Sequence, residues 1–135
     1  MSLDCQIDQK QRLVRVRAHG ILTVDDLWGY QRQMWSGTDL AGYDELVDMS
    51  DVEKIDSPSG DRVKALAELA AKSDATGPPS RLAIIAPSPL AFGLARMYEA
   101  YRGGVAGSTK QVGVFRTRDK ALEFLRRGER AGEPV

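Results

Sequence analysis

The chain has 135 residues and a mass of 14.8 kDa, the usual size of a single domain with its own hydrophobic core. Hydrophobic residues make up 42% and charged residues 28%, a composition that excludes a disordered chain. Because 19 basic residues balance 19 acidic ones, no overall charge attracts nucleic acid or an anionic membrane. We therefore expect one soluble domain over residues 1–135 that does not bind nucleic acid.

Cysteine usage and the start of the chain predict a location. Cys5 is the only cysteine, which excludes an intrachain disulfide and a multi-cysteine zinc or iron–sulfur site. The first residues lack a basic segment followed by an apolar one, and no apolar run approaches the length of a bilayer. We expect a cytoplasmic protein without membrane insertion.

The first predicted elements are two strands and a helix. Residues 12–19 alternate between apolar and polar side chains, as in a strand with one solvated face, and a weaker alternation over residues 4–9 predicts an antiparallel partner. Thr23 is a suitable helix N-cap, followed by Asp25 and Asp26, whose charges favour the first turn. An apolar stripe and the stop at Ser36-Gly37 complete this helix.

The middle of the chain predicts strands separated by helices. A short strand covers residues 45–49, and a helix presents Val63, Leu66, Ala67 and Ala70 on one face. Residues 82–86 are apolar without alternation, which is typical of a central parallel strand covered on both faces.

A third helix, a last strand and a last helix follow. Ser88-Pro89 begins the third helix, whose stripe is predicted to contain Leu90, Leu94, Met97, Tyr98 and Tyr101. Residues 111–115 predict a strand and Thr117 the cap of the last helix. The fold class is therefore α/β, with the order β-β-α-β-α-β-α-β-α and a mixed, mostly parallel sheet.

Few residues point to chemistry. Asp48, Asp51, Glu53 and Asp56 concentrate negative charge beyond the third strand, but their spacing matches no calcium loop, so a solvated polar turn is favoured over a cation site. Phe92 lies away from the stripe of its helix and is a candidate surface contact, either with a partner or with a neighbouring loop. We predict no catalytic residue, metal or cofactor, and hence no enzyme, since no nucleophile elbow or phosphate loop is present.

The segment from Glu45 to Gly60, which includes Asp56-Ser57-Pro58-Ser59-Gly60, resembles the central segment of STAS domains, the fold of SpoIIAA-type anti-sigma-factor antagonists. The later segments are similar to the SpoIIAA-like branch labelled STAS/SEC14-like. In the antagonists, a partner kinase phosphorylates the serine that follows the aspartate, and Ser57 matches that position. Pro58 departs from the pattern, and the alternative is that Ser57 only caps the helix, with Pro58 at its first position.

Two functions follow as expectations. The resemblance implies a non-enzymatic regulatory or protein-interaction module, with Ser57 as the candidate switch and Asp48, Asp51, Asp56 and Ser59 as its polar turn. Its partner would be a regulatory protein such as an anti-sigma-like kinase, and a homodimer is the base expectation for a soluble protein. The alternative is a small-molecule or lipid carrier or sensor of SEC14-like type, with Trp28, Trp35, Tyr98 and Tyr101 as candidate pocket walls.

Overall fold

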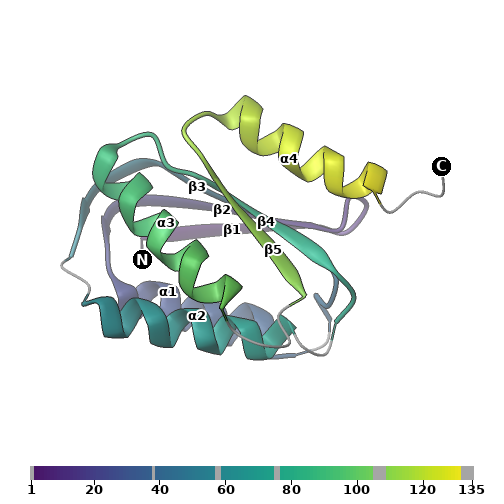
Figure 1. The fold of residues 1–135 in the computed structure, drawn as a ribbon, viewed down its shortest axis with the longest axis horizontal. Helices are drawn as coiled ribbons and strands as arrows, with labels where there is room; N and C mark the ends of the chain where they lie inside the picture. Colours follow the sequence, from purple (N-terminus) through teal and green to yellow (C-terminus); the bar gives the residue numbers. More distant parts are fainter. Residues whose placement is uncertain (1, 38, 57–58, 75–76, 105–108, 132–135) are drawn as a thin grey trace.

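The computed structural model describes residues 2–37, 39–56, 59–74, 77–104 and 109–131 (Figure 1). In chain order the elements are β1 (Leu3–Asp8), β2 (Leu13–Leu22), α1 (Val24–Trp35), β3 (Asp44–Ile55), α2 (Gly60–Asp74), β4 (Ser80–Ile85), α3 (Pro89–Gly103), β5 (Lys110–Phe115) and α4 (Arg118–Ala131). This is the order that the sequence predicts.

The five strands form one sheet in the order β1-β2-β3-β4-β5. β1 pairs with β2 antiparallel, and the other three pairs are parallel, so the predicted mostly parallel sheet is confirmed. Each crossover helix moves the chain one strand further in the same direction, which places α1, α2 and α3 on one face. α4 follows the last strand and packs across the other face, on β4 and β5 (Figure 1).

The core has one layer on each face of the sheet. On the α4 face, Leu46 and Ile85 pack with Ala121 and Leu125. On the opposite face, Leu82, Ile84 and Val114 pack with Ala91 and Ala95 of α3. β4 contributes side chains to both layers, which explains why residues 82–86 are apolar without alternation.

The helix starts show local capping. The Thr23 hydroxyl accepts a hydrogen bond from the Asp26 backbone N–H, and the Asp26 carboxylate accepts one from the Thr23 N–H, which completes a capping box at α1. Ser88 caps α3 with Pro89 in its first turn, as predicted. None of the helices in the described ranges has the length and apolar character needed to cross a membrane.

α3 buries a different face from the one that its larger side chains predict. Leu90 and Met97 are exposed, whereas Ala91, Ala95 and Arg102 are buried. The buried positions recur at helical spacing, and the two alanines lie against the apolar residues of β4 and β5. The predicted stripe was therefore wrong at Leu90 and Met97, because small side chains, which allow close packing, decide which face meets the sheet.

Candidate functional site

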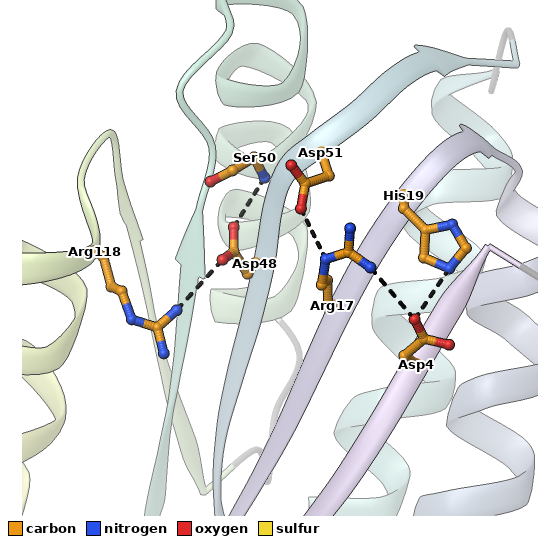
Figure 2. Close-up of polar contacts among 7 residues, drawn as sticks. All are labelled: Asp4, Arg17, His19, Asp48, Ser50, Asp51 and Arg118. Carbon is orange, nitrogen blue, oxygen red and sulfur yellow. Dashed lines mark hydrogen bonds and ion pairs between the residues drawn. The ribbon is translucent and has the colours of Figure 1, made fainter.

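The predicted polar turn after the third strand is instead part of a strand. β3 continues to Ile55, so Asp48 and Asp51 are strand residues and not loop residues. The register of β3 against β2 shifts between these two aspartates, and the Ser50 N–H donates to Asp48 Oδ1 at 2.9 Å (Figure 2). Residues three apart in a regular strand, such as Asp48 and Asp51, would point to opposite faces of the sheet. The irregularity instead places both carboxylates within reach of basic side chains of neighbouring elements.

The carboxylates of Asp48 and Asp51 each form an ion pair with an arginine side chain (Figure 2). Arg118 Nη1 lies 3.4 Å from Asp48 Oδ2, and Arg17 Nε lies 2.8 Å from Asp51 Oδ2. Arg17 Nη1 and His19 Nε2 both approach Asp4 Oδ2, at 3.5 and 3.2 Å. Within the described ranges, no group of three or more His, Cys, Asp or Glu side chains is placed to hold a metal ion. The cluster is a largely exposed ion-pair network on the sheet, an arrangement that contributes little stability.

The other predicted residues of the polar turn lie at the start of α2. The Ser59 hydroxyl and carbonyl both accept from the Arg62 N–H, and the Ser59 carbonyl also accepts from Val63. Ser59 therefore occupies an N-cap position directly before Gly60, the first residue of α2, and the interpretation in which Ser57 caps the helix with Pro58 at its first position is not tested. Ser57 and Pro58 lie outside the described residues. Asp56 is exposed, and no hydrogen bond or ion pair joins it to another described side chain.

Phe92, the candidate surface contact, is only partly exposed. Its ring packs against the core between α3 and the sheet, and the Arg116 guanidinium lies over it at 4.2 Å from the ring centroid. A cation over an aromatic face is itself a favourable contact. Of the two interpretations of Phe92, the structure therefore supports the contact with a neighbouring loop.

Cys5 is exposed on β1. Burial, with the nearby charge of Glu45, raises the pKa of the Cys5 thiol above its ordinary value. A raised pKa lowers the thiolate fraction, so the environment does not activate this cysteine as a nucleophile.

A mainly apolar cavity of about 110 Å³ lies between the sheet and the three helices on its α1 face. The sheet contributes Val47 and Ile84, and the helix walls are Leu27 of α1, Leu66 of α2 and Leu94 of α3. α2 packs on both α1 and α3, so the three helices together cover the cavity. Mainly apolar walls with a few polar groups are typical of small-molecule sites, although this cavity is smaller than the usual range of about 300 to 1,000 Å³.

One wall of this cavity carries a buried polar network. Tyr30 donates its hydroxyl hydrogen to Glu45 Oε2 at 2.5 Å and accepts from Trp35 Nε1 at 2.9 Å. The other Glu45 oxygen lies 3.3 Å from Lys110 Nζ, which also sits 3.6 Å from the Trp35 ring centroid. Burial and the Glu45 carboxylate raise the pKa of Tyr30 well above its ordinary value, so this phenol stays protonated.

Sequence reasoning predicted the cavity walls only in part. Tyr98 lines the cavity, but Trp28, Trp35 and Tyr101 do not. The polar wall residues Tyr30, Gln31 and Glu45 were missed, although the sequence holds a signal for two of them. Glu45 lies at a core-facing position of a strand and Gln31 interrupts the apolar face of α1, and a polar residue at a core position is an informative exception.

The comparisons support the fold. No protein-family model and no curated protein matches the sequence. Among solved structures, the fold is similar to that of an uncharacterized protein of the DUF3478 family from Shewanella loihica PV-4, described as having a SpoIIAA-like fold. The TM-score is 0.56 and the identity 16%, over 91% of each chain. With its five-stranded, mostly parallel sheet and intervening helices, the chain has the SpoIIAA-like fold that its central segment predicted.

Proposed function

We propose that this domain is a non-enzymatic module that binds a small, mainly apolar molecule in the cavity beneath α1, α2 and α3, as a carrier or sensor. The observation that carries the proposal is the cavity itself, with aliphatic walls from the sheet and from all three helices. On the α4 face of the sheet, by contrast, Asp51 and Asp48 are each paired with an arginine, Arg17 and Arg118.

The size of the cavity makes ligand binding a reasonable use for it. Protein interiors are close-packed, and few voids exceed the size of a water molecule. A cavity of about 110 Å³ leaves part of its apolar wall without packing partners in the ligand-free protein. A ligand that fills this space would supply the missing contacts and raise the free energy of unfolding of the domain.

Benzene and toluene are suitable small probes, because an apolar cavity of about 150 Å³, about a third larger than this one, binds benzene. Titration followed by ¹H–¹⁵N NMR should shift amide signals of Leu27, Leu66 and Leu94. The variant Leu94→Phe fills part of the cavity and should weaken toluene binding by about tenfold. Leu90→Phe is the matched control: the side chain is 59% exposed on the same helix and toluene affinity should not change.

Two results would reject this function. One is the absence of any shift with either probe up to its solubility limit in the wild-type protein. The other is equal toluene affinity in Leu94→Phe and Leu90→Phe, which would place the binding site outside the cavity. Circular dichroism and a thermal melt of each variant establish that the comparison is made between folded proteins.

A second function, a regulatory protein module switched by phosphorylation of Ser57 by an anti-sigma-like kinase, is supported by a separate observation. Asp56 and Ser59, on either side of Ser57-Pro58, are both exposed. α2, which begins at this segment, also provides Val63 and Leu66 of the cavity wall. A phosphate added before this helix would therefore act on the element that covers the ligand site.

Intact-mass and fragment mass spectrometry of the protein from its native cells tests the switch. The expected result is a phosphate on Ser57 that is lost in Ser57→Ala and retained in Ser59→Ala. An unmodified protein under growth and starvation conditions alike, or a phosphate on Ser59 only, would rule out the proposed switch.

A further inference from the structure

The chemistry of the ligand can be read from Gln31, a polar residue on the buried face of α1. Gln31 is 6% exposed and lines the cavity. No hydrogen bond joins its side-chain amide to any other residue that the structure describes. An amide with no protein partner at the wall of a cavity is placed to bond a polar group inside it.

The other polar side chains at the cavity wall are already hydrogen-bonded. The Thr23 hydroxyl accepts from the Asp26 N–H, and the Tyr98 hydroxyl accepts from Arg102 Nη1. Tyr30 bonds Glu45 and Trp35, as described above. Within the described part of the chain, Gln31 is therefore the wall residue whose donors and acceptor remain open to a ligand.

The electrostatics of the cavity wall favour an uncharged ligand. Glu45 is the charged residue that lines the cavity, and Lys110, 3.3 Å away, balances its charge. A charged ligand would lose its hydration and meet no free counter-charge on the described wall, which is strongly unfavourable in an apolar surrounding. A neutral hydroxyl, carbonyl or amide group loses much less hydration free energy on entering the cavity, and it gains a hydrogen bond to Gln31.

We propose that the cavity selects an uncharged, roughly benzene-sized molecule, or the end of one, with a single hydrogen-bonding group that pairs with the Gln31 amide. This inference rests on the proposed ligand-binding function and adds the class of ligand. An apolar cavity with no polar partner would prefer toluene to phenol, because phenol has to give up hydrogen bonds to water. With Gln31 as partner, that preference should disappear or reverse.

Phenol and toluene, which have nearly the same shape, provide the test. Wild-type protein should bind phenol at least as tightly as toluene, and benzoate and benzylammonium at least tenfold more weakly than phenol. In Gln31→Met, which keeps the length of the side chain but removes the amide, phenol affinity should fall about tenfold while toluene affinity is unchanged or higher. Gln33→Met is the matched control, since Gln33 is exposed on the same helix, and should leave both affinities unchanged.

The outcomes separate this inference from the function on which it rests. If neither toluene nor phenol binds the wild-type protein, the ligand-binding function fails. If toluene binds but phenol binds tenfold more weakly, or Gln31→Met leaves the phenol-to-toluene ratio unchanged, the function stands and the Gln31 inference is wrong. Benzoate or benzylammonium affinity equal to that of phenol would overturn the requirement for an uncharged ligand. If Gln31→Met does not fold, the ratio of phenol affinity to toluene affinity in the wild-type protein tests the Gln31 inference.

Discussion

Lys110 Nζ lies 3.3 Å from Glu45 Oε1, and the two side chains are only 3% and 4% exposed. A buried pair of this kind is weak evidence for net stabilisation, but removal of one partner leaves an uncompensated buried charge. We expect Lys110→Met to lower the free energy of unfolding by about 3 to 5 kcal/mol, measured by urea denaturation. The double variant Lys110→Met/Glu45→Gln should regain much of that loss, because no charge is then left unpaired.

The exposed ion pairs on the α4 face of the sheet provide a control for the buried Lys110–Glu45 pair. Arg17 is 54% exposed and contacts Asp4 and Asp51. Arg17→Met, the same change of cation to methionine, should cost about 1 kcal/mol or less, since exposed pairs are screened by solvent. Equal losses for Arg17→Met and Lys110→Met would contradict the difference in environment that the structure shows.

Tyr30 makes stability depend on alkaline pH. Its pKa in the folded protein is raised well above the value of about 10 expected for an unfolded chain. Above pH 10, the unfolded state loses the phenolic proton first and so binds fewer protons than the native state, which means that stability must fall as pH rises. Below pH 10, both states keep this proton and the contribution is constant.

Urea midpoints between pH 9 and 11.5 measure this effect. The wild-type midpoint should decline above pH 10, and Tyr30→Phe should decline less steeply over the same range. The variant should also be less stable at pH 7, by about 1 to 3 kcal/mol, because Glu45 Oε2 and Trp35 Nε1 lose their shared partner. Parallel pH curves for the two proteins would show that Tyr30 does not titrate differently on unfolding.

The start of α2 gives a third prediction. The Ser59 hydroxyl accepts from the Arg62 N–H at 3.3 Å, so Ser59→Ala should cost about 0.5 to 2 kcal/mol. Ser59→Asp should restore most of this loss, because aspartate also caps and complements the helix dipole. Thermal melts of both variants, with Ser57→Ala beside them, measure the effect. A larger loss of stability in Ser57→Ala than in Ser59→Ala would indicate that Ser57, and not Ser59, caps the helix.

The fold was predictable because its signals are local. The alternation of Val14 and Val16 on β2 and the Thr23 cap of α1 each depend on neighbouring residues, and the structure confirms both. The extent of β3 was not predictable in this way. Its polar second half is a strand because β2 pairs with it through two register shifts, and pairing between distant segments leaves no periodic signal in a sequence such as Ser50 to Ile55.

The candidate site was less predictable than the fold, for a related reason. Tyr98 was expected at a ligand cavity from the SEC14-like resemblance and its aromatic character, and it does line the cavity. Trp35 was expected there too, but it lies against Lys110 and Tyr30 and serves the buried network. Which side of a packed helix borders a void depends on how α1, α2 and α3 sit together, and that is a property of the tertiary structure.

Gln31 also affects the stability of the protein in the absence of any ligand. In the ligand-free protein the Gln31 residue is 6% exposed beside an apolar cavity, and its amide bonds no described residue. Methionine has a similar length and nearly the same helix propensity, so Gln31→Met removes the amide with little other change. We expect the free energy of unfolding of the ligand-free protein to rise, by at most about 1 kcal/mol, measured by urea denaturation. Gln33→Met, on the exposed side of α1, should change it by less than about 0.5 kcal/mol. A loss of stability in Gln31→Met would mean that the amide already has a partner, such as an ordered water, and that the ligand has to displace it.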